Sequence, residues 1–169
     1  MKRVFIMIVF LLFSFFSRGQ NKLGFDTMVN SLISSEVDTI GTTELADRQK
    51  HEHFILLDAR QKEEYDVSHI RGAKYVGYTD FDISSIADVP KTETIVVYCS
   101  IGKRSGDIGE KLKSAGYENV LNLYGGIFDW TNRGMEVVND ENESVRCVHP
   151  YSTLWGIWIN NYDKCYEPR

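Results

Sequence analysis

Short apolar runs alternate with helix-like stretches along the middle of the chain. The runs 54–57 (Phe-Ile-Leu-Leu) and 94–98 (Thr-Ile-Val-Val-Tyr) are brief, continuously apolar and rich in residues that favour strands. Runs of this kind are typical of strands buried on both faces of a parallel sheet. Residues 120–123 form a third, weaker strand candidate, and residues 39–40 and 74–76 can supply short flanking strands.

Helix signals occupy the segments between these runs. A polar cap at the start, apolar residues four apart and a terminal glycine are the signals of an amphipathic helix. Three helices are predicted: one begun by Thr42 and running through Glu44, Leu45 and Arg48; one over 103–115 with Ile108 and Leu112 on one face and Gly116 at its end; and a short one holding Ile127 and Trp130 that closes at Gly134.

Strands that alternate with helices predict an α/β domain in which helices cover the sheet. We place this domain at residues 39–136, after a polar lead-in at 20–38 and before an aromatic-rich C-terminal extension at 137–169. The extension opens with the acidic segment 139–143, which we expect to be a solvated loop. The chain has 169 residues, 43% hydrophobic and 25% charged, which suits one ordinary globular domain.

The first 19 residues have the layout of a signal peptide. A basic end, Lys2 and Arg3, precedes an apolar run at 4–16 and the small-residue site 17–19, with cleavage expected before Gln20. The alternative is an uncleaved membrane anchor, but a membrane span needs roughly 20 apolar residues and this run is shorter. We therefore expect a protein that is exported to the periplasm or secreted, without stable membrane insertion after cleavage.

The charge of the exported chain excludes one class of partner. Removing residues 1–19 takes three of the 19 basic residues and none of the 24 acidic ones, which leaves a formal charge of −8. Proteins that bind nucleic acid normally present a basic face, so no nucleic-acid partner is expected. An anionic substrate must be attracted by a local site rather than by the overall field.

Three cysteines are present: Cys99, Cys147 and Cys165. In an oxidising compartment an odd number favours one disulfide and one free thiol. Cys147 and Cys165 share the C-terminal extension, so we predict that they are bonded, which would stabilise the fold by about 3 kcal/mol. A metal bound by Cys147 and His149 is a weaker alternative, because two ligands without a matching pair make a poor site.

The strongest chemical signal is the segment 98–105, Tyr-Cys-Ser-Ile-Gly-Lys-Arg-Ser, which follows a predicted strand and opens a predicted helix. A turn of this kind directs backbone N–H groups into one concavity, where the helix dipole favours an anion. Helix N-termini and neighbouring cations also favour the thiolate form of a cysteine, which is its nucleophilic form. Lys103 and Arg104 supply the cations, and Gly102 permits a tight turn. Cys99 is therefore a candidate nucleophile rather than a small apolar residue that ends a core strand.

This loop resembles the Cys-x-x-Gly-x-Arg active-site loop of the rhodanese, or thiosulfate sulfurtransferase, family. Similar motifs lie in the family's order on both sides of it, and the resemblance covers about residues 40–134. One departure is Ser68, a turn position where the family usually has Gly. The motifs are Leu57-Asp58-Ala59-Arg60, Glu64-Tyr65 and Ser68 to Ala73 upstream, and Ala115-Gly116-Tyr117, Asn119-Val120, Leu123 to Ile127 and Trp130 downstream.

The resemblance implies a central, mostly parallel five-stranded sheet with helices on both faces, and a sulfur-transfer mechanism. Cys99 would take the outer sulfur of a small anionic donor such as thiosulfate, and cyanide or a thiol acceptor would then remove it. Lys103 and Arg104 would attract the donor, while Ser105 would bond the persulfide or cap the helix. No cofactor and no metal is implied. The residues expected to bind substrate through side chains or backbone amides are Ser100, Ile101, Gly102, Lys103, Arg104 and Ser105.

Three upstream residues have supporting roles by the same resemblance. Asp58 and Arg60 are expected to order loops beside the active site, and Arg60 can also border its pocket. His69 has the residue type of a general base, but its place in the segment 68–73 favours a role in fixing a turn.

Two rival functions remain open. Cysteine-based phosphatases and arsenate reductases have five residues between Cys and Arg, whereas four separate Cys99 from Arg104, and a smaller loop suits sulfur better than phosphate. A catalytically idle, partner-binding module of the same fold typically lacks the cysteine or the cations, and this chain retains both. Sulfur carriage between proteins shares the chemistry and differs only in the acceptor.

Overall fold

A computed structural model describes residues 22–168 of the chain. The five predicted strands form one sheet in the order β1-β5-β4-β2-β3, and every neighbouring pair is parallel. The predicted α/β class is confirmed, with parallel pairing throughout this sheet. The strands are β1 (Asp38–Ile40), β2 (Ile55–Asp58), β3 (Lys74–Tyr75), β4 (Thr94–Tyr98) and β5 (Asn119–Leu123).

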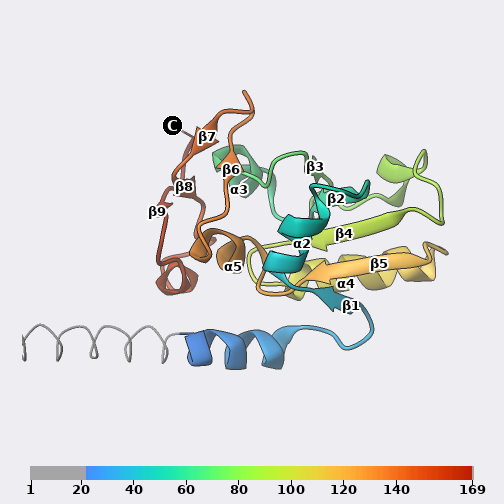
Figure 1. Ribbon diagram of the computed structural model, residues 1–169, viewed down its shortest axis with the longest axis horizontal. Helices are drawn as coiled ribbons and strands as arrows, with labels where there is room; N and C mark the ends of the chain where they lie inside the picture. The colour runs from blue at the N-terminus through green and yellow to red at the C-terminus, as the bar shows by residue number, and fades with distance from the viewer. Residues whose placement is uncertain (1–21, 169) are drawn as a thin grey trace, which may run out of the picture.

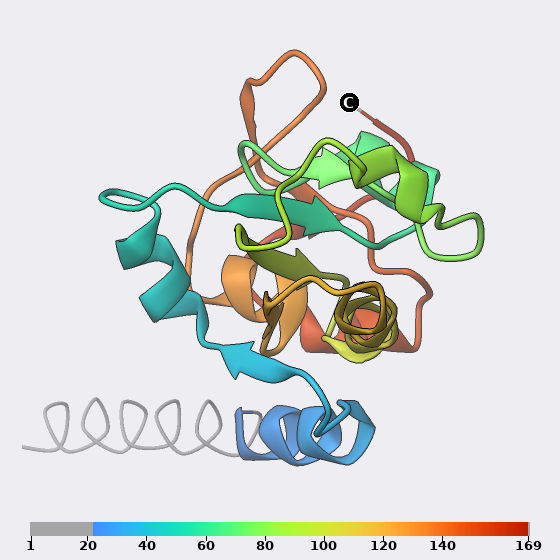
Figure 2. The same cartoon turned by 90° about the vertical axis from the view of Figure 1, so that its right-hand side faces the viewer.

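Helices cover both faces of the sheet (Figures 1 and 2). α2 (Thr42–Arg48) and α5 (Gly126–Asn132) pack on one face, and α4 (Lys103–Ser114) with the 3₁₀ turn η1 (Ile83–Ile86) covers the other. Side chains of β4 alternate between the two cores, with Val96 and Tyr98 on the α5 side and Ile95 and Val97 on the α4 side. The period of two along a strand thus divides one apolar run between two buried layers.

Two details of the helices differ from the sequence-based expectation. The residue before α2 that acts as its N-cap is Gly41, so Thr42 is the first helical residue. The Thr42 hydroxyl donates instead to Asp129 Oδ2 of α5 at 2.6 Å, which joins two helices. A further helix, α3 (Lys62–Val67), was not predicted; its Glu64 accepts a hydrogen bond from Gln61 N at 3.1 Å and satisfies an amide at the helix start.

The lead-in is part of the packed core. Residues 22–32 are helical, and Phe25 and Val29 are buried in the same cluster as α5. The ring of Phe25 also lies against that of Trp158, with 5.7 Å between centroids. A segment whose composition indicated a polar lead-in therefore connects the domain to the C-terminal extension.

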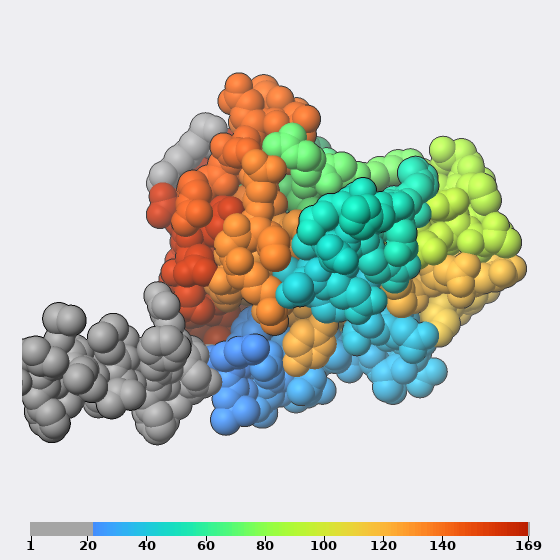
Figure 3. Space-filling view, viewed as in Figure 1, coloured from blue at the N-terminus to red at the C-terminus, as the bar shows by residue number. Residues whose placement is uncertain are grey.

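The C-terminal extension lies beyond the carboxyl ends of β4 and β5 and packs against that end of the domain (Figures 1 and 3). It contains an antiparallel pair, β6 (Val137–Val138) with β7 (Ser144–Val145), whose turn, 139–143, is the predicted polar loop. A parallel pair follows, β8 (Cys147–Val148) with β9 (Asp163–Lys164), with the 3₁₀ turn η2 (Trp155–Trp158) between them.

Buried side chains anchor this extension. Val137, Val148 and Ile159 belong to the core cluster of the α5 face. Asn132 Nδ2 donates to the carbonyl of Trp158 at 2.6 Å. The hydroxyl of Tyr162 donates to the carbonyl of Met135 at 2.9 Å. The extension is thus a third packed layer over one end of the domain.

The predicted signal peptide, residues 1–19, lies outside the described residues. Within residues 22–168, none of the helices combines the length and the apolar character needed to cross a membrane.

Candidate active site

Cys99 lies directly after β4, at the turn that opens α4. Its side chain is buried, with 1% exposed, and its Sγ accepts a hydrogen bond from the amide of Gly102 at 3.1 Å. Gly102 is the N-cap of α4 and has φ 108°, a left-handed conformation that favours glycine. The amides of the next three residues belong to the first helical turn and have no intrahelical acceptor. The thiol therefore faces a helix start rich in N–H donors.

The loop after β5 holds the thiol loop from behind. Ile127 N donates to the carbonyl of Cys99 at 2.9 Å, and Phe128 N donates to that of Ser100 at 3.1 Å. This approach requires Gly126, because a Cβ at that position would overlap the carbonyl oxygen of Cys99. These two hydrogen bonds hold the backbone of the loop in the conformation in which the Gly102 amide donates to Cys99 Sγ.

A buried asparagine in β5 fixes the other end of the loop. Asn122 Nδ2 donates to the carbonyl of Gly102 at 2.8 Å, and its Oδ1 accepts from the hydroxyl of Ser105 at 2.7 Å. Ser105 is fully buried in this contact. Its hydroxyl thus donates to Asn122 and does not cap the helix, while the bond to a persulfide that the family resemblance implied stays a prediction.

Both cations of the loop are paired with carboxylates. Arg104 makes a two-pronged ion pair with Glu64 of α3, at 2.6 and 2.8 Å, and donates to the hydroxyl of Ser100 at 2.9 Å. Lys103 pairs with Asp107 one turn further along α4. Both cations are therefore already paired in this structure, and their expected role in attracting an anionic donor stays a prediction.

The pKa values of the buried pair reflect this contact. Burial opposes the charge on Arg104, but hydrogen bonds to Glu64 and the attraction of Cys99 and Glu64 raise its pKa above the ordinary value. Burial likewise opposes ionisation of Glu64, yet hydrogen bonding to Arg104 and its positive charge leave that pKa lowered. Each partner therefore keeps the other charged beside the loop.

A cavity of about 210 Å³ opens onto the thiol. Five of its lining residues come from the loop and two come from the extension. The Tyr151 ring lies against the guanidinium of Arg104, 4.9 Å from Cζ to the ring centroid. The lining residues are Cys99, Ser100, Ile101, Lys103, Arg104, Tyr151 and Trp155.

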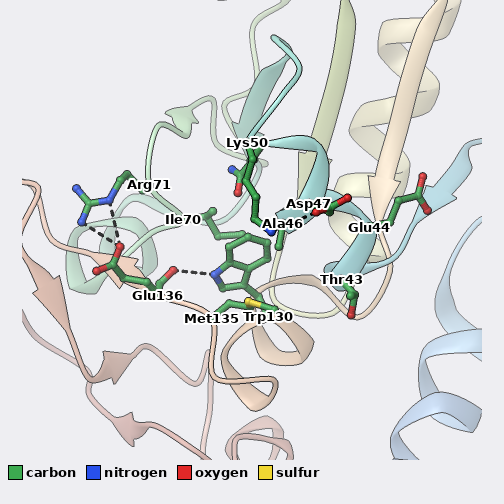
Figure 4. A pocket seen from close by; sticks show the side chains of 11 residues that line it. Thr43, Glu44, Ala46, Asp47, Lys50, Ile70, Arg71, Trp130, Met135 and Glu136 are labelled. Carbon is green, nitrogen blue, oxygen red and sulfur yellow. Dashed lines mark hydrogen bonds and ion pairs between the residues drawn. The ribbon is translucent and has the colours of Figure 1, made fainter.

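A larger hollow, about 730 Å³, lies elsewhere on the domain (Figure 4). Figure 4 shows the indole of Trp130 in its lining and, at the rim, the ion pair of Arg71 with Glu136, 3.1 Å apart. The lining holds neither cysteine nor histidine and shares no residue with the Cys99 cavity. The chemistry of the lining, not its volume, thus identifies the candidate active site.

Asp58 and Arg60 form an ion pair at the end of β2 that is fully buried. Arg60 Nη2 donates to Asp58 Oδ2 at 2.7 Å and to the carbonyl of Ser68 at 2.6 Å. Burial opposes the charge on Arg60, and attraction to Asp58 and Tyr98 raises its pKa overall. The pair orders the loops around it, and Arg60 does not line the Cys99 cavity.

His69 and Ser68 hold the turn after α3. The His69 ring stacks on that of Tyr65, 3.9 Å between centroids, and its backbone exchanges two hydrogen bonds of 2.8 Å with Val138. Burial lowers the pKa of His69, against the effect of its bond to the Tyr65 carbonyl. Ser68 is in extended conformation, and its hydroxyl donates to the carbonyl of Cys147 at 2.6 Å, so the residue that departs from the family pattern binds the extension.

All three cysteines lie within the described residues. Cys147 and Cys165 are joined in a disulfide, as predicted, with 5.8 Å between their Cα atoms, and Cys99 is free. Over the part of the chain that the structure describes, no group of three or more His, Cys, Asp or Glu side chains is arranged to hold a metal ion.

The roles of three site residues were missed by sequence reasoning: Glu64, Asn122 and Tyr151. Glu64 stood in a family-like motif, but nothing there indicated its partner. Asn122 was visible as a polar residue within an apolar strand, which is a usable signal for a buried hydrogen-bonding role. Tyr151 gave no signal, because only the fold brings it to the thiol, whereas the disulfide predicted in the extension could already place Trp155 near the pocket mouth.

The fold and the loop together define a class: α/β proteins with a cysteine at the turn between a central parallel strand and a helix. This chain belongs to the rhodanese-like family, since the family model described as Rhodanese-like domain matches residues 41–133, more than half of its length. Among solved structures, the Rhodanese-like domain of Alr3790 from Anabaena sp. has a TM-score of 0.56 at 26% identity. That match covers 60% of this chain and 78% of the other.

Two curated relatives are similar to this chain over part of its length. The uncharacterized protein slr1261 of Synechocystis sp. is 27% identical over 118 residues, which cover 70% of this chain and 65% of that protein. A protein named sulfurtransferase, from Allochromatium vinosum, is 39% identical over 56 residues, 33% of this chain and 52% of its own length. The chain thus spans less than two thirds of each of these two relatives.

Proposed function

We propose that this protein is a sulfurtransferase that carries a sulfane sulfur as a persulfide on Cys99. One observation carries the proposal: the buried Cys99 Sγ accepts the Gly102 amide at 3.1 Å, at the start of α4 and in the lining of a small cavity. Backbone N–H groups that converge on a sulfur stabilise negative charge there, both on the thiolate and on a persulfide. The family and the relative named sulfurtransferase support the same class of chemistry.

The proposed reaction has two balanced displacements. The Cys99 thiolate attacks the outer sulfur of a donor such as thiosulfate; a new S–S bond forms, the donor's S–S bond breaks, and sulfite leaves with the electron pair. Cyanide or a thiolate then attacks the outer sulfur of the persulfide. The S–S bond to Cys99 breaks, and the thiolate is restored as thiocyanate or a new persulfide leaves.

Phosphatase activity is disfavoured on two grounds. Four residues separate Cys99 from Arg104, one fewer than in phosphatase loops, which makes a smaller cradle. The guanidinium edge of Arg104 is also occupied by Glu64 and Ser100 instead of facing a substrate oxyanion. A protein that carries sulfur from one protein to another would use the same first step and is the second candidate.

The place of action is part of the proposal. The signal-like layout of residues 1–19 and the Cys147–Cys165 disulfide support export to an oxidising compartment, periplasmic or outside the cell. N-terminal sequencing of the protein purified from its own host should begin at Gln20. A chain that still begins at Met1 would contradict export with cleavage.

The activity test uses thiosulfate and cyanide with the purified protein. We expect thiocyanate to accumulate with the wild type and none above background with Cys99→Ser. A parallel incubation with an aryl phosphate should release no phosphate. Thiocyanate formation that survives Cys99→Ser would overturn the assignment of the nucleophile, and turnover of the aryl phosphate would revive the rival activity.

A further inference from the structure

We infer that Tyr151 and Trp155 select the sulfur acceptor, and that the acceptor is a thiol with a compact apolar group beside its sulfur. The inference rests on the proposed function, because it concerns the second displacement at Cys99. Both side chains belong to the C-terminal extension and lie outside residues 41–133, the part matched by the family model. Membership of the family therefore says nothing about this part of the cavity.

The size of the cavity limits what can reach the thiol. Its volume of about 210 Å³ is small beside typical ligand pockets, which have about 300–1,000 Å³. It corresponds to about seven water molecules at roughly 30 Å³ each. Tyr151 and Trp155 are the lining residues with large aromatic side chains, so they set how much room remains beside Cys99.

Tyr151 is held in an unusual conformation at this position. Its φ is 63°, a left-handed value that is uncommon for a residue with a side chain, and its amide donates to His149 Nδ1 at 3.0 Å. Such conformations persist where the surroundings enforce them, and they concentrate at functional sites. Here the strained backbone places the ring over the Arg104 guanidinium, a cation–π contact at 4.9 Å.

The extension that carries these rings is fastened close by. The Cys147–Cys165 disulfide ties β8 to the segment after β9, and Ser68 binds the carbonyl of Cys147 at 2.6 Å. Asn132 of α5 binds the carbonyl of Trp158 at the other end of η2. A wall held at several points is already in place before an acceptor arrives, which reduces the entropy lost on binding.

The charges of the lining disfavour an acceptor with carboxylates. Arg104 has its edge occupied by Glu64 and its face covered by Tyr151, and Lys103 is paired with Asp107. A compact anion can still reach the loop amides at Cys99. The carboxylates of a peptide thiol lie far from its sulfur and would meet aromatic rings, where an unpaired charge is costly to bury.

In the acceptor step, the outer sulfur of the Cys99 persulfide is transferred to the thiol acceptor. The acceptor thiolate attacks the outer sulfur of the Cys99 persulfide and forms the new S–S bond. The bond between that sulfur and Cys99 breaks, and Cys99 leaves with the electron pair as its thiolate. The acceptor departs as a persulfide, so no external oxidant or reductant is required.

The test compares two acceptors of different shape on the loaded protein. Wild type is treated with thiosulfate, freed of excess donor, and mixed with benzyl mercaptan or glutathione at equal thiolate concentrations. Mass spectrometry follows the loss of the sulfur from Cys99. We expect benzyl mercaptan to react at least about tenfold faster, a difference equivalent to about 1.4 kcal/mol.

Variants assign the preference to the aromatic wall. Trp155→Ala and Tyr151→Ala should each lower the ratio of the two rates by about tenfold, since each opens the apolar side of the cavity. Leu154→Ala is the matched control, because Leu154 lies in the same segment but is 72% exposed and does not line the cavity. The ratio of the two rates in this variant should equal that of the wild type. Trp155→Leu and Tyr151→Leu replace an alanine variant that loses its circular dichroism signal. Leucine is smaller than either aromatic ring, so these variants also open the cavity and should lower the ratio of the two rates, by less than alanine does.

The outcomes separate this inference from the function on which it rests. A wild type that takes up no sulfur on Cys99 overturns the proposed function, and the acceptor inference with it. A wild type that forms the persulfide but reacts equally fast with both thiols overturns the acceptor inference alone. Folded variants of Tyr151 and Trp155 that keep the wild-type ratio would likewise overturn the acceptor inference and leave the proposed function standing.

Discussion

The two sides of the Cys99 cavity are held in place by different means. The thiol loop is buried and fixed by backbone hydrogen bonds from α5 and by Asn122 of β5. The aromatic side, Tyr151 and Trp155, is partly exposed and depends on a disulfide and a few polar contacts of the extension. The position of the nucleophile is thus a property of the domain core, while the shape of its surroundings is a property of the added segment.

This contrast separates chemistry from selectivity. A change in the core should remove activity, because the Gly102 amide and Cys99 Sγ lose their mutual placement. A change in the extension should alter stability or acceptor preference and leave a thiol that still takes up sulfur.

The largest effect is expected from Gly126→Ala, on the core side. The added Cβ would overlap the carbonyl oxygen of Cys99, and φ 54° is itself unfavourable for alanine. We expect loss of thiocyanate formation and a destabilisation of roughly 3 kcal/mol or more, measured by urea unfolding. Gly24→Ala is the control, because its Cβ would make only ordinary contact with Trp158 and the variant should remain active. An active, stable Gly126→Ala protein would contradict the described contact between the two loops.

The next effect comes from Arg60→Met. This change leaves Asp58 buried without its cation, and removing one partner of a buried ion pair costs about 3–5 kcal/mol. Arg71→Met is the matched control, since Arg71 is 44% exposed in its pair with Glu136 and such surface pairs contribute about 1 kcal/mol or less. Equal losses of unfolding free energy in the two variants would show that the Asp58–Arg60 pair does not hold the loops.

On the extension side, replacing Cys147 and Cys165 by serine should lower the free energy of unfolding by about 3 kcal/mol, because the unfolded chain is no longer closed into a loop. The folded variant should still form the persulfide on Cys99, since the thiol loop makes its contacts within the domain. Chemical denaturation and mass spectrometry measure the two properties separately. Failure of the folded variant to take up sulfur would remove the distinction between the two sides.

A smaller and pH-dependent effect is expected from Glu64→Gln. The pKa of Glu64 is lowered in the folded protein, so its contribution to stability is present above the ordinary value of 4.5 and is lost as the pH falls through the folded value. Hydrogen bonds to charged groups contribute about 1.5–3 kcal/mol. The free energy of unfolding of the variant near neutral pH should therefore be lower than that of the wild type by about this amount. That deficit should shrink in thermal unfolding as the pH is taken further below 4.5, because wild-type Glu64 takes up a proton as the pH falls through its lowered folded pKa. A deficit that grows on acidification would contradict the ion pair with Arg104.

Local patterns sufficed for the parts of the fold that local chemistry determines. The apolar runs 54–57 and 94–98 predicted the central strands, because strands buried on both faces are continuously apolar. The segment 98–105 predicted the thiol at a helix start, since strand, glycine and helix signals are adjacent in sequence. Residues 42–48 were predicted as a helix, but the role of Thr42 depended on Asp129, far along the chain.

Contacts between distant segments were not predictable from one sequence. Arg104 was expected to face a donor, and its partner Glu64 lies 40 residues away on a helix that the pattern did not reveal. Ser105 was assigned to the sulfur or the helix cap, but Asn122 of a neighbouring strand binds it. The extension was separated from the domain because its composition differs, yet packing brings Tyr151 to the active site.

The most direct measurement is the intact mass of the native protein, with peptide mapping, after incubation with thiosulfate and again after addition of cyanide. We predict a gain of one sulfur atom, located on the peptide with Cys99, and its loss when cyanide is added. Cys99→Ser should show no gain. A wild-type protein whose mass is unchanged by thiosulfate, or whose added sulfur lies on another residue, would contradict the proposal that Cys99 carries the transferred sulfur.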